Sequence, residues 1–216
     1  DRVTGGCGYV GSILVKKLVD EGFNVKVIDS LIFGKDSIEK LIENKSIHLA
    51  SNDLRDTQKI KSELTGVDSV IHLAAIVGEP LCKKIPESAL QINEFASKNL
   101  ASLSKKAGVK RFIFASTCSN YGSSSEIVDE TSSTQPLSLY SKTKVNSENF
   151  ILSLEDDHFE PCIFRFATAH GLSPRMRFDL PISEFTRDLA LGNDLLVYDA
   201  ETWRPYCHVL DFSRLI

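Results

Sequence analysis

A tyrosine and a lysine four residues apart, Tyr140 and Lys144, form the pair with the clearest chemical meaning in the sequence. On a helix this spacing places the phenol and the ammonium on the same face. A nearby cation stabilises a tyrosinate, and a phenol pKa of about 10 must fall before the group can take a proton at neutral pH. Two exposed polar side chains on a helix give the same pattern, so the pair is informative only together with a second motif.

The second motif is a glycine-rich run near the start of the chain, Thr4-Gly5-Gly6-Cys7-Gly8-Tyr9-Val10-Gly11. Glycines at every third position allow a tight turn, close approach of a pyrophosphate and close packing of a helix on a strand. A helix that begins there offers its free N–H groups to phosphates. Asp29 ends the next predicted strand and is placed to accept hydrogen bonds from ribose hydroxyls. No Arg or Lys occupies positions 30–32 to receive a 2′-phosphate, so the pattern predicts NAD and not NADP.

Short apolar runs alternate with longer helical patterns along most of the chain. Strands are predicted at residues 25–29, 46–50, 70–74, 111–115 and 161–166, and helices at residues 9–20, 88–106 and 137–154. Strands that are apolar throughout suit a parallel sheet covered on both faces. The alternation therefore predicts an α/β fold built from βαβ units with right-handed crossovers.

Composition and charge narrow the class of protein further. The 216 residues are 42% hydrophobic and 25% charged, with a formal net charge of -4. This balance argues against a surface for nucleic acid or for an anionic membrane. The longest apolar stretch, residues 70–78, is too short to cross a bilayer. Together these features predict a soluble protein. The five widely spaced cysteines include no C-x-x-C pair, so they predict reduced thiols, no metal site and a cytoplasmic location.

Further motifs lie between and after these two along the chain. They are Asp29-Ser30-Leu31, Asn52-Asp53-Leu54-Arg55-Asp56, His72-Leu73-Ala74-Ala75, Asn93, Ser116-Thr117-Cys118-Ser119-Asn120-Tyr121-Gly122 and Arg204-Pro205-Tyr206-Cys207-His208-Val209. Over nearly the whole chain the set resembles the extended short-chain dehydrogenase/reductases of the NAD-dependent sugar-nucleotide epimerase/dehydratase family. The resemblance implies a Rossmann doubly wound parallel sheet with a smaller, incomplete C-terminal substrate-binding domain. It is specific for the family and much less specific for the substrate.

The resemblance implies a division into two regions. Residues 1–166 are expected to form the NAD-binding Rossmann domain. The regular alternation ends near Ala167, so residues 167–216 are expected to form a partial substrate-binding region, with about 206–216 returning to the Rossmann domain. Both ends look cut, because only three residues precede the glycine-rich run and a helical pattern stops at Ile216.

The resemblance also implies a role for each matching residue. The residues implied to bind NAD are Gly5, Gly8, Tyr9 and Val10 at the pyrophosphate, Asp29 at the adenosine ribose, Asp53 and Leu54 at the adenine, Leu73, Ala74, Ala75 and Asn93 toward the nicotinamide ribose, and Phe166 near the nicotinamide. Thr117 takes the place of the active-site Ser/Thr, Tyr140 is the acid/base and also belongs to the NAD site, and Lys144 binds the ribose. The residues implied to bind the substrate are Thr117, Thr168, Arg177 and Arg204. Arg175 is a further phosphate candidate, for which a solvated loop is an equally good interpretation.

Departures from the family pattern narrow the chemistry. Dehydratases of the family carry an Asp-Glu pair where Cys118 and Ser119 stand here, and fucose synthases place a catalytic Cys at the position of Ser119. Cys118 is therefore interpreted as a packed thiol. His170 stands where a Tyr is common and receives no role.

These departures predict NAD-dependent epimerisation of a nucleotide-diphosphate sugar through a transient 4-keto intermediate. A 4-ketoreductase, a dehydratase or a decarboxylase of the same family is the alternative within this class. A non-catalytic NAD-binding regulator is the alternative from another class, although Thr117, Tyr140 and Lys144 together argue against it.

A homodimer is expected, with the helices that carry Asn93 and Tyr140 at the subunit interface. Four apolar positions either line that interface or belong to the chain's own core: Leu100, Leu103, Phe150 and Leu152.

Overall fold

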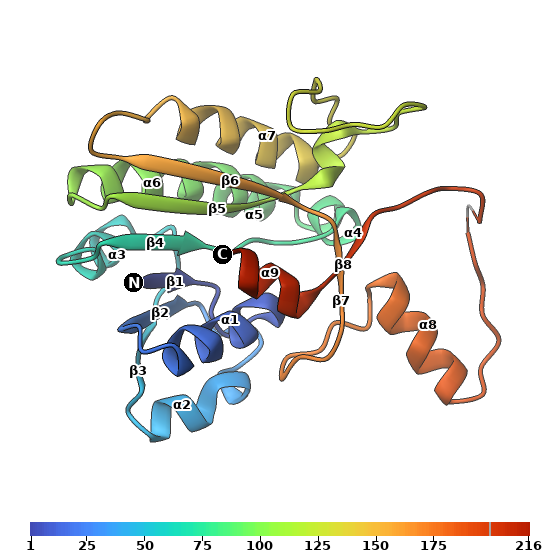
Figure 1. The fold of residues 1–216 in the computed structure, drawn as a ribbon, viewed down its shortest axis with the longest axis horizontal. Helices are drawn as coiled ribbons and strands as arrows, with labels where there is room; N and C mark the ends of the chain where they lie inside the picture. The colour runs from blue at the N-terminus through green and yellow to red at the C-terminus, as the bar shows by residue number, and fades with distance from the viewer. Residues whose placement is uncertain (199) are drawn as a thin grey trace.

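Within residues 1–198 and 200–216, which the computed structural model describes, six parallel strands form the centre of the molecule (Figure 1). They are β1 (Arg2–Thr4), β2 (Val25–Asp29), β3 (Ile47–Ser51), β4 (Ser69–His72), β5 (Arg111–Thr117) and β6 (Glu160–Phe166). Their order across the sheet is β3-β2-β1-β4-β5-β6. This is the Rossmann strand order, and it reverses between β1 and β4, where open α/β sheets bind their ligands. The predicted doubly wound parallel sheet is confirmed.

Helices cover both faces of this sheet (Figure 1). The helices of the described residues are α1 (Tyr9–Asp20), α2 (Glu39–Glu43), α3 (Thr57–Glu63), α4 (Glu79–Lys84), α5 (Pro86–Leu90), α6 (Ser97–Lys106), α7 (Leu139–Leu152), α8 (Pro181–Ala190) and α9 (Val209–Leu215), of which α8 stands apart from the sheet. Residues of α3, α6 and α7 share one hydrophobic cluster with the sheet, and residues of α1 share the other. Within the described part of the chain, none of these helices is long and apolar enough to span a membrane.

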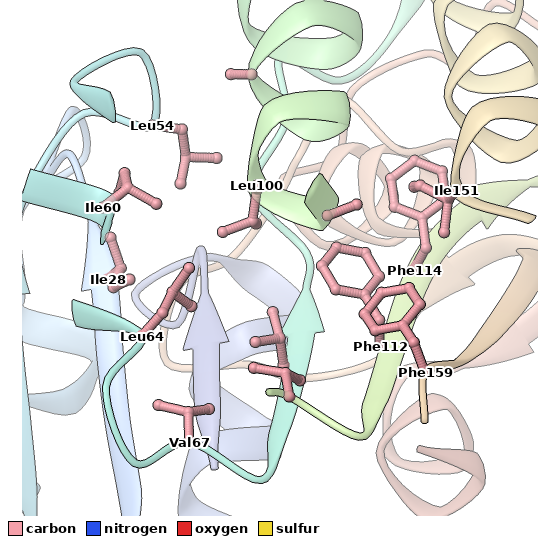
Figure 2. Packing of buried hydrophobic residues seen from close by; sticks show 14 of the residues in the cluster. Ile28, Leu54, Ile60, Leu64, Val67, Leu100, Phe112, Phe114, Ile151 and Phe159 are labelled. Carbon is pink, nitrogen blue, oxygen red and sulfur yellow. The ribbon is translucent and has the colours of Figure 1, made fainter. Parts of the chain in front are cut away.

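Strand β5 shows how the sequence fills both layers. Phe112 and Phe114 are fully buried on the face of α6 and α7, where they pack near Ile151 and Phe159 (Figure 2). Ile113 points to the opposite face and joins the cluster around α1. Successive side chains of a strand alternate between the faces of a sheet, so a strand that is apolar throughout must be covered on both sides.

Element boundaries differ from the predicted ones where a neighbouring element decides them. Strand β5 continues two residues further than predicted because Ser116 and Thr117 pair with β6. The strand predicted at 70–74 ends at His72. The helix predicted at 88–106 consists of α5, a π-helical stretch Gln91–Ala96 and α6. The helices α2, α3, α4 and α8 were not predicted, since most are too short to show an apolar period.

The four apolar positions considered for a dimer interface divide into two pairs. Leu100 is fully buried and Leu103 packs against the same cluster, so both belong to the chain's own core. Leu152 is 44% exposed, and Phe150 is partly buried with the Lys98 ammonium 5.9 Å from its ring centroid.

The C-terminal segment forms a second, smaller arrangement (Figure 1). Strand β7 (Thr168–His170) pairs in parallel with β8 (Tyr206–His208), and α8 lies between them in sequence. Helix α9 then packs against α1, and Phe212 of α9 stacks on Phe166 with ring centroids 4.2 Å apart.

Candidate active site

The turn between β1 and α1 is built from glycines because side chains have no room there. Gly5 has a φ of +74°, and its N–H donates to the Ile28 carbonyl at 2.9 Å. A Cβ on Gly5 would lie 2.8 Å from the Ala74 backbone, and a Cβ on Gly11 would lie 2.1 Å from the Gly5 oxygen. Gly6, to which the sequence assigned no role, is equally restricted, since its Cβ would lie 2.6 Å from a valine side chain of β2.

This turn fits the pyrophosphate of NAD. Helix α1 begins at Tyr9 after Gly8, and no side chain from the described residues caps its first turn. The N–H groups of that turn and the positive end of the helix dipole are thus available to an anion. The backbone of Gly5, Gly8, Tyr9 and Val10, with no Cβ at the two glycines, would hold the two phosphates.

Asp29 lies at the carboxyl end of β2 and joins two loops. Its Oδ2 accepts from the Cys7 N–H at 3.0 Å, and its Oδ1 accepts from the Leu31 N–H at 2.9 Å. Each carboxylate oxygen has a second lone pair, which leaves acceptors for the hydroxyls of a ribose. Asp53 and Leu54, which are expected at the adenine, follow β3 in the chain. Leu54 is buried in the core. A hydrogen bond from the Arg55 side chain lowers the pKa of Asp53.

Asn93 is fully buried and holds the loop after β4. Its Oδ1 accepts from the Ile76 N–H and its Nδ2 donates to the Ile76 carbonyl, both at 2.8 Å. The residues expected along the nicotinamide ribose, Leu73, Ala74 and Ala75, belong to this loop and are partly buried. Asn93 therefore supports this loop, because both polar atoms of its amide are hydrogen-bonded to the backbone of Ile76.

His72 connects three elements beneath the site. Its Nδ1 is 2.7 Å from the Thr4 hydroxyl of β1, and its Nε2 is 2.8 Å from the Ser97 hydroxyl of α6. Burial, followed by the charge of Lys144, lowers the pKa of His72 to about 3. The imidazole is therefore neutral at physiological pH.

Lys144 of α7 contacts β5 two residues before Thr117, which ends this strand, and Tyr140 lies on the same helix one turn earlier. Helix α7 begins with a capping box between Ser138 and Ser141, which places Tyr140 in its first turn. The Lys144 Nζ donates to the Ala115 carbonyl at 2.8 Å and lies 6.0 Å from the ring centroid of Tyr140. Thr117 ends β5, and its Oγ1 accepts from the Ser119 N–H at 3.2 Å.

The electrostatics of this group differ from the simple expectation for a Tyr-Lys pair. Burial raises the pKa of Tyr140, and the positive charge of Arg177 opposes that rise. Burial also lowers the pKa of Lys144 to about 8, against the opposing charge of Glu148. The cation that counteracts the burial of the phenol is thus Arg177, a residue that the sequence assigned to the substrate.

The substrate-side residues come from the C-terminal segment and are less enclosed. Arg204 is exposed, and Arg177 forms an ion pair with Asp179 at 2.5 Å. The Thr168 N–H donates to the Pro205 carbonyl at 3.1 Å, so Thr168 contacts the residue that follows Arg204.

Three further candidates have described surroundings. Cys118 is partly buried, and burial raises the pKa of its thiol, as expected for a packed group. The ring of His170 stands edge-on to that of His208 at 5.2 Å. The Arg175 guanidinium lies over the Phe33 ring, 4.2 Å from its centroid.

The segment after β7 is attached to the first turn of α1. The Tyr9 phenol donates to the Gly171 carbonyl at 2.6 Å, and the Ser173 hydroxyl donates to the Tyr9 carbonyl at 2.7 Å. The side chain of Tyr9 is therefore committed to this contact, and only its backbone is available to a phosphate. Sequence reasoning did not find this contact, because the partners are more than 160 residues apart.

Glu148 is another residue to which the sequence assigned no role. It is buried one helical turn after Lys144 and pairs with Arg165. The signal was present, since Tyr140, Lys144 and Glu148 follow one another at four-residue intervals.

The fold and this site together define a dinucleotide-binding α/β protein with a Tyr-Lys pair beside its glycine turn. A model of the NAD dependent epimerase/dehydratase family matches residues 2–216. The chain belongs to the NAD-dependent epimerase/dehydratase family. The predicted family and its NAD dependence are thereby confirmed.

Named relatives agree with this family. The UDP-glucose 4-epimerase of Halalkalibacterium halodurans is 28% identical over 98% of this chain and 68% of its own length. The bifunctional protein gal10 of Schizosaccharomyces pombe is 27% identical over 98% of this chain, which spans 34% of the length of that relative. UDP-glucuronic acid decarboxylase 1 of Xenopus tropicalis is 28% identical over 97% of this chain and 50% of its own length.

Solved structures show the same architecture. MoeE5 in complex with UDP-glucose and NAD is 31% identical, with a TM-score of 0.83 over 99% of this chain and 69% of that chain. A dTDP-glucose 4,6-dehydratase of Streptomyces venezuelae with NAD is 25% identical, with a TM-score of 0.89 over 99% of this chain and 69% of that chain. Relatives of this chain therefore include epimerases, a decarboxylase and a dehydratase.

Proposed function

We propose that this protein epimerises a nucleotide-activated hexose, using NAD and passing through a transient 4-keto sugar. The observation that supports this most directly is the contact of Lys144 with Ala115 near the carboxyl end of β5, which brings the Tyr140–Lys144 pair of α7 to the end of the strand that carries Thr117. The glycine turn after β1 lies at the same edge of the sheet, because the carboxyl ends of parallel strands share one edge.

Each side chain of this group has one task in the proposed reaction. The phenolate of Tyr140 takes the proton of the sugar hydroxyl as general base and later returns it. The hydroxyl of Thr117 donates a hydrogen bond to the oxygen that becomes the ketone. The ammonium of Lys144 binds ribose hydroxyls and, with Arg177, favours the phenolate. Bound NAD supplies a nicotinamide ring that accepts hydride and gives it back.

The substrate is held by its nucleotide in this proposal. Arg204 and Arg177 provide positive charge for the diphosphate, and guanidinium groups match phosphate oxygens in geometry. Binding energy from this remote part retains the keto sugar while the hexose itself is held loosely. The sugar can then present either face for the return of hydride. A UDP-hexose is the first candidate, because MoeE5 and the bacterial relative act on or bind UDP-glucose by name.

Cys118 and Ser119 favour epimerisation over dehydration. Elimination of water needs an acid and a base near the sugar, and these two positions in the turn after Thr117 carry a thiol and a hydroxyl. Burial raises the pKa of the Cys118 thiol, which makes it a poor substitute for a carboxylate. A 4-ketoreductase shares the remaining groups and is the second candidate.

We also propose that two copies pair through the outer faces of α6 and α7. Phe95 at 49% and Leu152 at 44% are exposed hydrophobic residues of this part of the molecule. Light scattering of the full chain that shows a monomer at every concentration would contradict the dimer.

The experiment that tests the proposed activity is a panel of UDP-, dTDP-, CDP- and GDP-hexoses, incubated with the full chain and NAD. We expect NMR to show a new anomeric signal for one nucleotide sugar, without net consumption of NAD. Stoichiometric reduction of NAD to NADH with accumulation of a keto sugar would indicate a ketoreductase running in reverse. Binding of NAD without any change in the sugars or in cofactor absorbance would indicate a non-catalytic regulator.

A further inference from the structure

A buried ion pair lies one helical turn beyond Lys144 and has no part in the reaction proposed above. Glu148 of α7 is 1% exposed, and it accepts hydrogen bonds from Arg165 of β6, at 2.9 Å from Nη2 and 3.1 Å from Nε. A buried carboxylate is costly unless it is paired and hydrogen-bonded. The pair therefore fixes Glu148, and with it one face of α7, against the edge strand of the sheet.

The same carboxylate also holds the segment that carries Thr117. The Asn120 Nδ2 donates to Glu148 Oε1 at 2.7 Å and lies 3.0 Å from the hydroxyl of Ser116, to which it also donates. Ser116 precedes Thr117 in β5, and Asn120 belongs to the 3-10 turn that follows it. One amide group thus connects both flanks of Thr117 to Glu148.

The ionised state of Glu148 dictates how this amide is turned. The Asn120 Oδ1 is buried and has no hydrogen-bond partner among the described residues. Rotation of the amide would place this oxygen against a carboxylate oxygen, which is repulsive while Glu148 is charged. Arg165 adds a second attachment, since its Nη1 donates to the Tyr121 phenol oxygen at 3.1 Å.

We propose that Glu148 is a positioning residue, which locks the Tyr140–Lys144 face of α7 to the Thr117 segment and places its own carboxylate one helical turn from the Lys144 ammonium. This inference rests on the proposed function, because that function gives Thr117, Tyr140 and Lys144 their tasks. Glu148 itself touches neither substrate nor cofactor in this account.

The electrostatic part of the proposal follows from what surrounds Lys144. Burial lowers the pKa of Lys144 to about 8, and the charge of Glu148 is the largest influence in the opposite direction. The other titratable groups facing the ammonium are Tyr140 on α7, Cys82 on α4 and the neutral His72 on β4. Removing the charge of Glu148 therefore lowers the pKa of Lys144 further, so that the ammonium loses its proton at a lower pH.

The test compares Glu148→Gln with Glu148→Asp. We expect Glu148→Gln to lower turnover about tenfold to a hundredfold, because a small displacement of reacting groups has that cost. In the same variant, the alkaline limb of both the turnover profile and the NAD-affinity profile should move to lower pH. Glu148→Asp keeps the charge, so its alkaline limb should stay at the wild-type pH even if turnover falls.

Glu94→Gln is the matched control. Glu94 is also a buried carboxylate with an ion pair, to Lys98 at 2.6 Å, and accepts a hydrogen bond from Asn146 of α7 at 2.9 Å. We expect Glu94→Gln to leave the alkaline limb unchanged in the turnover profile and in the NAD-affinity profile. An alkaline limb that stays in place in Glu148→Gln, or that moves equally in Glu94→Gln, overturns the electrostatic role.

Asn120→Ala keeps the proposal testable if Glu148→Gln does not fold. It removes the connection to Ser116 and leaves the Glu148–Arg165 pair, so turnover should fall while the alkaline limb stays in place. Wild-type turnover in Asn120→Ala overturns the positioning role. If no nucleotide sugar is turned over by the wild-type protein, the proposed function fails, and the NAD-affinity profile of Glu148→Gln, compared with that of Glu148→Asp, still decides whether Glu148 keeps Lys144 charged.

Discussion

The sheet region, residues 1–166, and the C-terminal segment, residues 167–216, hold their candidate site residues in different ways. In the sheet region Lys144, Asn93 and Asp29 each form hydrogen bonds to the backbone of another element. In the C-terminal segment Arg204 is exposed beside Trp203, which is 97% exposed. The cofactor side of the site is therefore fixed by the fold itself, whereas the substrate side presents side chains at the surface.

This difference has an electrostatic consequence. Charges interact more strongly where water is excluded, so the pKa of the buried Tyr140 responds to the charge of Arg177 and the pKa of the buried Lys144 responds to the charge of Glu148. Burial lowers the pKa of Lys144 and raises that of Tyr140, whereas an exposed guanidinium such as Arg204 remains solvated. Substitutions in the sheet region should therefore alter stability and cofactor binding, whereas substitutions in the C-terminal segment should alter substrate affinity.

The largest expected contrast is in stability. Phe112→Ala removes a fully buried ring from the core between the sheet and α6 (Figure 2), and should cost about 3–5 kcal/mol of unfolding free energy. Trp203→Ala removes a larger but exposed ring and should change stability by less than about 0.5 kcal/mol. Urea unfolding of both variants measures the two values. Equal losses would show that the C-terminal segment is packed as tightly as the sheet.

The glycine turn offers a second contrast within the sheet region. Gly11→Ala places a Cβ 2.1 Å from the Gly5 oxygen, so it should cost about 1–3 kcal/mol through overpacking and reduce NAD affinity at least tenfold. Gly66→Ala is the control. Its φ of +68° strains the backbone when a side chain is added, but its Cβ meets no atom within 4 Å. Calorimetry should find wild-type NAD affinity in Gly66→Ala. Unchanged affinity in Gly11→Ala would contradict the placement of the pyrophosphate.

The neutral, buried His72 predicts an acid sensitivity that belongs to the sheet region. Its folded pKa of about 3 lies below the unfolded value of about 6.5, so the unfolded state binds a proton between these values and the folded state does not. Stability should therefore fall as the pH drops below 6.5, by about 2 kcal/mol between pH 7 and pH 5.

His72→Gln isolates this contribution, because glutamine does not titrate. Unfolding free energies of the two proteins should change in parallel above pH 7 and diverge below pH 6.5, with the smaller acid-induced loss in the variant. Identical losses in both proteins would show that His72 takes up a proton in the folded state.

The smallest expected effect concerns the surface of the C-terminal segment. Arg204→Ala should raise KM for the nucleotide sugar about tenfold, as expected for one lost charge-assisted contact of about 1.4 kcal/mol. NAD affinity and thermal stability should stay at wild-type values, because Arg204 is exposed. Arg214→Ala, at another exposed arginine of this segment, serves as control. An unchanged KM in Arg204→Ala would place the diphosphate elsewhere.

The parts of the site that were predictable obey local rules. Glycines at 5, 8 and 11 mark a turn that excludes Cβ atoms, and the i,i+4 spacing of Tyr140 and Lys144 is a property of any helix. Asn93 was expected to support the path to the nicotinamide ribose, and the π-helical stretch that carries it brings both ends of its amide to Ile76, a partner that the sequence does not indicate. That contact depends on how two elements pack, which a single sequence does not encode locally.

The same reason explains the remaining differences. Leu100 fits an outer or an inner face of α6 equally well by pattern, and only the packing of α6 on the sheet decides that it is buried. Arg177 influences Tyr140 because the segment after β7 returns to α1 through Gly171 and Ser173. Such long-range contacts fix the electrostatics of the site, although its residue types were readable from the sequence.

The central claim is that Tyr140 moves the proton of the sugar hydroxyl while the sheet region holds the cofactor independently. Tyr140→Phe removes the phenol oxygen and keeps the ring, so turnover of the nucleotide sugar should fall by about two to four orders of magnitude. NAD affinity, measured by calorimetry on the same preparation, should stay close to wild type, and Tyr198→Phe at an exposed tyrosine should change neither quantity. Near-normal turnover in Tyr140→Phe would contradict the account and place the base elsewhere, with His170 the first residue to test.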